Sequence, residues 1–381
     1  MRRGTKVRAM RGRKTGPVGQ CKAGSVKSFK MGETMAEITI KDIAKQCGVG
    51  VSTVSRAINN HPDINPETQR MIMQVIEQTG FIPNNSARNL KRTDAKCIAV
   101  LVKGIANPFF SSMIRIIEEE TQRSRYALVI RHVEAREDEV DVALELEKEK
   151  RLRGIVFLGG RFSHSEEKLN KLKVPFIFST IGVDISDRLG KIDFSCIAVD
   201  DKLESRKMTE YLIDLGHRDI AFITERPEES IGRRRIDGYR EAFAERGLEV
   251  REELICYVQE QLDHFSMENG YITAKKLLES GKKVTAVYAA SDILAIGVCR
   301  AVLEAGKRIP EDISVAGYDG IELGEYYNPK LTTIKQPIEQ MAKSTIRMLL
   351  DVIAGREEHQ QIILPAELVE RESTARMCVL F

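Results

Sequence analysis

The feature that most constrains the fold is a change of sequence pattern near residue 96. From there onward, short apolar runs bounded by Gly, Pro or charged residues alternate with amphipathic stretches of helical period. This alternation predicts parallel strands joined by crossover helices that cover both faces of a sheet. The predicted strands are Ile98–Val102, Ala127–Val133, Gly154–Leu158, Pro175–Ser179, Cys196–Val199, Asp219–Thr224, Thr285–Ala289 and Ser314–Gly317. The clearest helical stretches are Ser111–Arg125, Glu204–Leu215, Arg235–Arg246 and Ile293–Ala305.

The length of this region indicates how many cores it forms. About 280 residues lie near the upper limit of roughly 250 to 300 residues at which single hydrophobic cores stop growing. We therefore expect two doubly wound lobes. A cleft between two such lobes is the natural place for a small ligand.

The basic residues are concentrated at the N-terminus. Residues 1–34 hold ten Lys or Arg and a single acid, Glu33, although the whole chain carries a net charge of only +3. This segment has no hydrophobic period, so we expect it to be disordered in isolation. It is either a nucleic-acid-binding arm or the product of an upstream start codon, with the natural protein beginning at Met31 or Met35. We favour the second interpretation, because ordered pattern begins abruptly after Met35.

Two short helices are predicted just beyond this segment. Thr39 can cap a helix over Ile40–Gln46, with Asp42 at the third helical position in a capping-box arrangement. The helix ends at Gly48 and its neighbours. A second helix, Ser52–Asn59, follows within about four residues.

A third helix begins at Asn65-Pro66-Glu67, which offers a cap, a proline at the first helical position and an acid in the first turn. It ends at Gly80. Two short helices joined by a turn that contains Gly, followed by a packing helix, form a helix-turn-helix.

The second helix of this motif has residues suited to reading DNA. Arg56 is the best candidate for bidentate pairing with a guanine edge. From spacing alone, a small helical hairpin with a solvated Ser/Thr face remains an alternative. The side chains suited to phosphate or base contacts are Ser52, Thr53, Ser55 and Asn59. The apolar back of the motif is Ile43, Ala44, Val54 and Ile58.

The composition and the missing motifs exclude several protein classes. No run approaches the ~18 to 20 apolar residues of a membrane-spanning helix, and residues 1–30 lack the apolar core of a secretory signal. The seven cysteines are scattered singly, which is typical of reduced thiols in a cytoplasmic protein. We find no hydrolase elbow, phosphate-binding loop or zinc motif, and the six histidines are isolated. We therefore expect no cofactor, no metal and no enzymatic activity.

The motifs taken together closely resemble the lactose/galactose-repressor (LacI/GalR) family over residues 37 to about 375, in the family's order. The headpiece motifs are Ile38–Ala44, Gly48–Asn59 and Gly80–Asn84. The later motifs are Asn107-Pro108-Phe109-Phe110, Gly238-Tyr239, Ser291-Asp292, Gly317-Tyr318-Asp319 and Leu331–Pro337.

The resemblance implies an α/β protein with an N-terminal helix-turn-helix headpiece and two parallel-sheet lobes of periplasmic-binding-protein type. Residues 1–36 would be a disordered basic extension, 37–83 the DNA-binding domain and 84–96 a hinge helix and linker. Residues 97–381 would bind the effector and dimerise. Within them, the first lobe would comprise about 97–198 and 338–356, and the second about 199–337 and 357–381.

The family resemblance also implies roles in DNA binding. Val51, Ser52 and Arg56 match the positions that read the major groove, and the apolar Val51 favours a thymine methyl. The hinge matches Asn84–Lys91, where Leu90 would wedge into a minor-groove step from each subunit of a dimer. Leu90 packing on the headpiece is the alternative. The hinge residues expected to contact DNA are Asn84, Ala87 and Leu90.

The effector site implied by the resemblance lies between the lobes. Arg235 and Asp319, facing each other across the cleft, suit a polyhydroxylated ligand, and Phe109 could cover an apolar sugar face. The alternatives are a closing salt bridge or a solvated helix end for Arg235 and Asp319, and a helix cap for Ser291 and Asp292. The full set of pocket residues is Asn107, Phe109, Arg235, Ser291, Asp292 and Asp319.

Three consecutive cations, Arg233-Arg234-Arg235, bear on the charge of the ligand. If more than one points into the cleft, a uronic acid or phosphosugar is favoured over a neutral sugar. We expect only Arg235 to face the cleft.

These features predict a sequence-specific transcriptional regulator, most consistent with a repressor. A homodimer would bind a pseudo-palindromic operator in double-stranded DNA, and a small-molecule effector, expected to be a sugar, would control its affinity. Relief of repression is expected, although corepression also occurs in the family. The alternatives are a sugar-binding protein or a carbohydrate-processing enzyme without DNA function.

Overall fold

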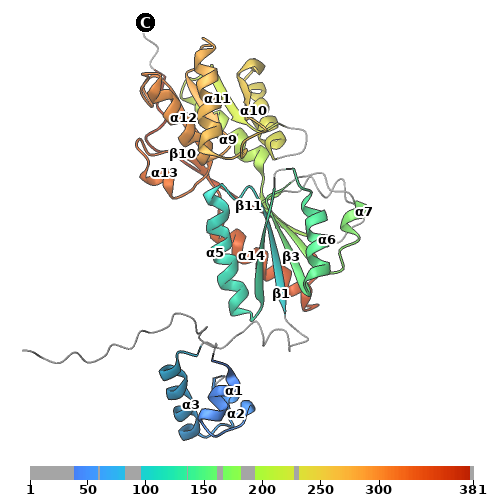
Figure 1. The fold of residues 1–381 in the computed structure, drawn as a ribbon. Coiled ribbons are helices and arrows are strands. Elements are labelled where there is room, and N and C mark those ends of the chain that lie inside the picture. The colour runs from blue at the N-terminus through green and yellow to red at the C-terminus, as the bar shows by residue number, and fades with distance from the viewer. Residues whose placement is uncertain are drawn as a thin grey trace, which may run out of the picture. The chain divides into compact units, whose positions relative to one another are not determined.

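The computed structural model describes residues 38–58, 61–81, 96–134, 136–160, 166–181, 194–226 and 231–377. The chain forms two compact units, Met1–Leu90 and Lys91–Phe381 (Figure 1). The expected N-terminal extension, 1–36, and most of the expected hinge, 84–95, lie outside the described residues. No helix in the described ranges is long and apolar enough to cross a membrane.

The first unit has the helix-turn-helix arrangement that the sequence predicts. The Asp42 carboxylate accepts hydrogen bonds from the backbone N–H and the hydroxyl of Thr39, at 2.9 and 2.6 Å. Asn65 caps the third helix by accepting from the N–H of Glu67 at 2.8 Å, and Gly80 ends that helix with a φ of 63°. The helices are α1 (Ile40–Gln46), α2 (Val51–Ile58) and α3 (Pro66–Thr79).

A small core holds these three helices together. Its buried members come from every helix, and half-buried Ile58 packs against them, so the predicted apolar back of the motif is confirmed. The buried side chains are Ile43, Ala44, Val54, Ala57 and Ile72.

The first lobe of the second unit is a parallel sheet of order β11-β5-β4-β3-β1-β2. Helices α5 and α14 cover one face, and α6 and α7 cover the other (Figure 1). The strands are β1 (Cys97–Lys103), β2 (Ala127–Val133), β3 (Leu152–Leu158), β4 (Phe176–Ser179), β5 (Ser195–Val199) and β11 (Gln361–Leu364). The helices are α5 (Pro108–Arg123), α6 (Glu139–Glu149), α7 (Glu166–Leu169) and α14 (Ile338–Ile353).

Strand β1 explains how this sheet buries both faces. Ile98, Val100 and Val102 belong to the same core cluster as α5 and α14. The intervening residues, Ala99 and Leu101, belong to the cluster that contains α6. Successive residues of a strand point to opposite faces, so a strand covered on both sides is apolar throughout.

The second lobe is a sheet of order β12-β10-β9-β8-β6-β7, parallel except for β12, which runs antiparallel to β10. Helices α9 and α10 pack together as one pair, and α11 and α12 as another. The strands are β6 (Ile220–Thr224), β7 (Ile255–Tyr257), β8 (Ala286–Ala289), β9 (Ser314–Asp319), β10 (Thr332–Lys335) and β12 (Glu367–Val369). The helices are α9 (Asp201–Asp214), α10 (Gly232–Glu245), α11 (Met267–Glu279), α12 (Asp292–Glu304) and the short α13 (Leu323–Tyr326).

Two glycines bring α11 and α12 unusually close. A Cβ atom on Gly270 would overlap the carbonyl oxygen of Leu294, and one on Gly297 would overlap that of Met267. Because both obstacles are backbone atoms, they cannot swing aside as a side chain could, and only glycine allows this approach.

All eight predicted strands are present, with ends displaced by at most two residues. Strands β7, β10, β11 and β12 were not expected. They have three or four residues each, too few for a strong period-2 signal.

The chain crosses between the lobes three times, after β5, after β10 and after β11. The sequence interpretation placed the third crossing near Glu357, and the structure corrects it. Gln361–Leu364 pairs with β5 as the edge strand of the first lobe, so the chain enters the second lobe only before β12. The missed edge strand accounts for the error.

A buried carboxyl at the start of α12 ties three segments of the second lobe together. Asp292 is fully buried and accepts from the N–H of Ile321 at 2.8 Å and from the Thr333 hydroxyl at 2.6 Å. Burial, reinforced by the nearby Asp319 carboxylate, raises the pKa of Asp292 to about 8. The side chain is therefore mostly neutral at physiological pH.

This raised pKa gives stability a pH dependence. Because the folded-state pKa exceeds the ordinary value of 3.8, the stabilisation is complete below about pH 4 and is lost as pH rises toward 8. Asp292→Asn mimics the protonated carboxyl, so we expect its unfolding free energy relative to wild type to increase between about pH 5 and 8, by up to ~1.4 kcal/mol per pH unit. Urea unfolding across that range measures the slope.

Asp312→Asn is the matched control. Hydrogen bonds from Arg308 lower the pKa of Asp312 to about 2, so its titration lies below the tested range. Parallel pH profiles for wild type and Asp292→Asn would contradict the prediction.

Candidate functional site

One face of α2 is open to solvent while its other face packs in the headpiece core. Val51 is 42% exposed, Ser52 and Arg56 are also exposed, and Thr53 and Ser55 are half-buried. The opposite face is anchored by the buried Val54 and Ala57. The structure thus brings together five of the predicted DNA-reading residues on an accessible helix face. The remaining four, Asn59, Asn84, Ala87 and Leu90, lie outside the described residues.

The second unit contains a cavity of about 290 Å³ lined by both lobes. Its volume is close to the lower end of small-molecule sites, ~300 to 1,000 Å³. Four of the six predicted effector residues line it: Asn107, Phe109, Arg235 and Asp319.

Asp319 connects the two lobes. It ends β9 in the second lobe, and its Oδ2 accepts from the Asn107 amide of the first lobe at 2.8 Å. Its Oδ1 accepts from the Gln336 amide at 2.9 Å, just where the chain crosses between lobes. Asp319 has a φ of 114°, and backbone strain of this kind, of order 1 to 3 kcal/mol, is typical of functional sites.

Burial raises the pKa of Asp319 to about 6, against the opposing effects of Arg235 and the two amide hydrogen bonds. The carboxylate is therefore mainly ionised at neutral pH. It can accept hydrogen bonds from a ligand as well as from the protein.

Arg235 lines the cavity but does not face Asp319 across it, because both residues belong to the second lobe. This corrects the expected arrangement. Arg235 is 3% exposed, and the Nε and Nη2 of its guanidinium each lie 2.9 Å from the Asp201 carboxylate of α9. It also donates to the carbonyl of Ala290 and stacks on the Tyr318 ring, 3.6 Å from the centroid.

The other two arginines of the triplet point elsewhere. Arg233 is exposed, and Arg234 lies 3.2 Å from the carboxylate of Asp200. Of these three arginines, only Arg235 lines the cavity, as expected, and Asp201 balances its charge.

Aromatic side chains form an apolar part of the wall. Phe109 is 2% exposed overall and packs edge-on against Phe110, with ring centroids 5.4 Å apart. Asn107 caps α5 by accepting from the N–H of Phe109 at 3.0 Å. The helix cap therefore positions a polar and an aromatic cavity residue together.

Ser291 and Asp292 are not among the described residues that line the cavity. Ser291 caps α12 by accepting from the N–H of Leu294 at 3.2 Å, and Asp292 is bound within the second lobe as described above. The geometry therefore favours the helix-cap alternative for Ser291, whereas Asp292 holds segments of the second lobe together and is not a cap.

Several cavity residues were missed by the sequence interpretation. Lys103 ends β1, Glu225 follows β6, and Gln336 follows β10. Ligands of doubly wound folds bind at the carboxyl ends of the strands, so inspection of the residue after each predicted strand would have found Lys103 and Glu225. Gln336 follows β10, a strand that the sequence did not predict. Within the described ranges, no group of three or more His, Cys, Asp or Glu side chains could hold a metal ion.

Comparison with known proteins agrees with this architecture. Residues 39–84 match the model of bacterial regulatory proteins, lacI family, and residues 209–374 match the periplasmic binding protein-like domain. The HTH-type transcriptional regulator MalR of Clostridium butyricum is 38% identical over 338 residues, which cover 88% of this chain and 99% of MalR.

Two similar solved structures contain sugars. The complex of the transcriptional regulator CelR with cellobiose is 28% identical, with a TM-score of 0.63 and coverage of 88% of this chain and 99% of CelR. A LacI family regulator from Enterococcus faecium with bound ribose is 30% identical, with a TM-score of 0.64 and coverage of 74% and 100%. The chain thus belongs to the lacI family of bacterial regulatory proteins, and it is a DNA-binding transcriptional regulator governed by a small-molecule effector.

Proposed function

We propose that two copies of this chain form a homodimer that represses transcription from a pseudo-palindromic operator and responds to a neutral sugar. The observation that carries this proposal is the cavity of about 290 Å³, which both lobes line and in which buried polar groups are already held in place. A two-fold dimer presents two copies of α2 to two half-sites, which makes an inverted repeat the matching DNA sequence.

The charge balance of the cavity supports a neutral ligand over a uronate or a phosphosugar. Asp201 neutralises Arg235, and Arg234 is bound to Asp200 away from the cavity. A sugar hydroxyl can donate to the Asp319 carboxylate and accept from an amide or guanidinium donor. The relatives with bound cellobiose and ribose support the same class.

The link between ligand and DNA lies in the contact of Asn107 with Asp319. A sugar that inserts into or reinforces this hydrogen bond changes the preferred angle between the lobes. In the dimer, that change alters the spacing of the two hinge segments. Coupling of this kind is typically about 1 to 3 kcal/mol.

We assign DNA reading to the exposed face of α2. Arg56 pairs with a guanine, Val51 contacts a thymine methyl, and the neighbouring hydroxyls contact phosphates or bases. Asn59 and the hinge residues Asn84 and Ala87 add contacts, and Leu90 wedges into the minor groove. A sugar carrier or a sugar-processing enzyme without DNA function is not favoured, because the relatives are transcriptional regulators.

Replacing Arg56 tests the reading of bases. We expect Arg56→Ala to cost about 1 to 3 kcal/mol at one base pair of each half-site and to relax discrimination there. Fluorescence anisotropy with an operator series substituted at single positions measures this loss. Arg70→Ala, an exposed residue of α3, is the control and should not change the rank order of sites. Equal discrimination by wild type and Arg56→Ala would refute the assignment.

Replacing Asp319 tests the effector site. Asp319→Asn retains the shape and tolerates the positive φ, but its amide puts a donor against Asn107 or Gln336. We expect at least tenfold weaker sugar binding, because hydrogen bonds to a charged group are lost, and loss of the sugar response in operator-release assays. Operator binding without sugar should persist. Glu311→Ala, an exposed acid in the same lobe, should respond normally, whereas an unaltered response of Asp319→Asn would exclude this site.

A further inference from the structure

The fully buried Asp292 lies behind the turn that presents Asp319 to the first lobe. Its Oδ2 accepts from the N–H of Ile321, two residues after Asp319, at 2.8 Å. Its Oδ1 lies 2.6 Å from the hydroxyl of Thr333, three residues before Gln336. One carboxyl therefore binds both of the chain segments from which Asp319 and Gln336 meet each other at the lobe contact.

The turn after Asp319 needs such support, because its backbone is strained. Asp319 has a φ of 114°, and Gly320 has a φ of 75°. A Cβ atom on Gly320 would lie 2.7 Å from the Cα of Lys335, so the turn passes directly against β10. A residue other than glycine keeps a positive φ only where its surroundings enforce it. The N–H of Gln336 donates to the carbonyl of Asp319 at 3.1 Å, and Asp292 fixes the other side of the turn.

The surroundings of Asp292 favour its neutral form. Burial, and then the Asp319 carboxylate, raise the pKa of Asp292. Arg235, the guanidinium that acts on Asp319, is already shared with Asp201. An ionised Asp292 would thus add a third carboxylate to a buried cluster with one guanidinium, which is costly. The other titratable groups of this cluster are Tyr318 on β9 and Tyr288 on β8.

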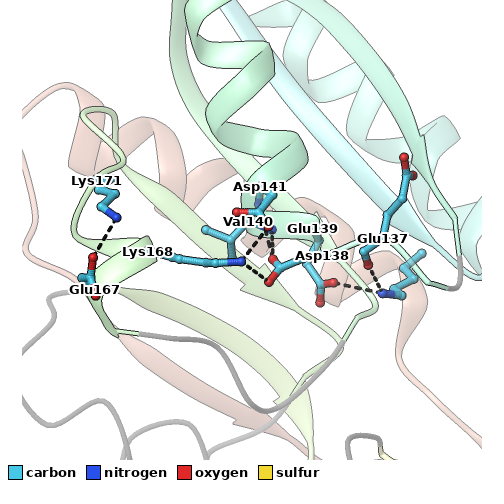
Figure 2. A network of polar contacts seen from close by, with 9 residues as sticks. Glu137, Asp138, Glu139, Val140, Asp141, Glu167, Lys168 and Lys171 are labelled. Carbon is cyan, nitrogen blue, oxygen red and sulfur yellow. Dashed lines mark hydrogen bonds and ion pairs between the residues drawn. The ribbon is translucent and has the colours of Figure 1, made fainter.

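A position at the start of a helix does not by itself make an aspartate neutral. Asp141 lies in the first turn of α6, as Asp292 does in the first turn of α12. Figure 2 shows that Lys168 reaches both Asp141 and Asp138, at 2.6 and 2.8 Å from their carboxylates. The described partners of Asp292 are instead an N–H group and a hydroxyl. The contrast in charge therefore arises from the partners and not from the helix.

The neutral form of Asp292 completes a chain of hydrogen bonds. A protonated carboxyl has one O–H donor and keeps an acceptor oxygen. The O–H can donate to the Thr333 hydroxyl, which in turn donates to the carbonyl of Ile334 at 3.3 Å. The other oxygen still accepts from Ile321. Loss of the proton reverses the first of these bonds and leaves two carboxylates in one buried site.

The proton on Asp292 and the contact between the lobes favour each other. While Asn107 is bound to Asp319, the Asp319 carboxylate is buried and increases the proton affinity of Asp292. Separation of the lobes would admit water, which screens Asp319 and lowers that affinity. Because linkage is reciprocal, the proton stabilises the joined lobes by the same factor.

From these contacts we propose that neutral Asp292 is a positioning residue that keeps Asp319 in the lobe contact, and that loss of its proton weakens this contact. The regulator then responds to pH as well as to its effector. This inference rests on the proposed coupling between effector and lobe angle, and it adds the proton as a second regulatory input.

The first test needs no effector. Hydrogen–deuterium exchange at about pH 7 follows residues 107–110 of the first lobe, which a role of Asp292 confined to the second lobe would leave unchanged. We expect Asp292→Ala to accelerate exchange there at least about threefold. Asp292→Asn should exchange like the wild type, because its amide can donate to Thr333 as the protonated carboxyl does. Unchanged exchange in Asp292→Ala, or equal acceleration in Asp292→Asn, would overturn the proposal.

Asp141→Ala and Asp141→Asn are the matched controls. They change an aspartate in the first turn of a helix that is ion-paired (Figure 2) and lies outside the lobe contact. Both should exchange at residues 107–110 like the wild type.

The second test observes the proton itself. A neutral carboxylic acid has a carbonyl stretching band apart from those of carboxylates and amides. We expect the infrared difference between wild type and Asp292→Asn to contain this band at about pH 6.5 and to lose it by about pH 9.5. A difference spectrum without the band at the lower pH would show that Asp292 is ionised and would refute the proposal.

The third test connects the proton to the effector. Calorimetry at about pH 7, 8 and 9 measures binding of cellobiose and ribose. We expect the affinity of the wild type, relative to that of Asp292→Asn, to fall at least about threefold over this range. A constant ratio would contradict the proton linkage. If neither sugar binds, the proposed effector class is wrong, and the exchange and infrared measurements still decide the role of Asp292.

Thr333→Val keeps the first test decisive if Asp292→Ala does not fold. It removes the hydroxyl that bonds to Asp292 and leaves the carboxyl in place. Thermal melting of the effector-free protein identifies a variant that does not fold. We then expect Thr333→Val to accelerate exchange at residues 107–110, and exchange equal to that of the wild type would overturn the proposal.

Discussion

The hydrogen bond between Asn107 and Asp319 is the constraint on which the effector unit depends. It joins the N-terminal cap of α5 in the first lobe to the end of β9 in the second, and Gln336 fixes the same carboxylate from the crossover. A buried carboxylate needs such partners, since burial without them is costly. A ligand that hydrogen-bonds to Asp319 would compete with or add to the contact that relates the two lobes, which is the physical basis of the coupling proposed above.

Much of this fold could be predicted from local chemistry. The capped start of α3 at Asn65 and its glycine end at Gly80 appear where the sequence places them, because caps depend on neighbouring residues only. Strands buried on both faces, such as β1, are apolar throughout and are found readily. The short strand β11 has exposed residues and lies at a sheet edge, so only its pairing with β5 identifies it.

The cavity was less predictable, because its composition depends on how segments far apart in the chain meet. The motif around Ser291 and Asp292 has a strong local explanation as the start of α12. Ser291 does cap that helix, but Asp292 binds Ile321 and Thr333 elsewhere in the same lobe. Conversely, Lys103 and Glu225 have no local motif and become meaningful only when two sheets place their strand ends at one cavity. The partner of Arg235 is likewise nonlocal: Asp201 lies on a neighbouring helix, 34 positions earlier in the chain.

The pairing of charges around the cavity explains how a polar site can discriminate among ligands. Arg235 and Glu225 are buried and Lys103 is half-buried, each beside a counter-ion, so none attracts a charged ligand strongly. Binding would remove water from the anionic group of a charged sugar. Because Arg235 and Lys103 are already paired with Asp201 and Glu139, they would compensate that loss poorly, which opposes binding. A neutral sugar gains oriented donors and acceptors, which are rigid because their counter-ions fix them. Counter-ion pairing thus turns charged residues into a hydrogen-bonding surface, which suits the neutral sugar proposed above better than a charged ligand.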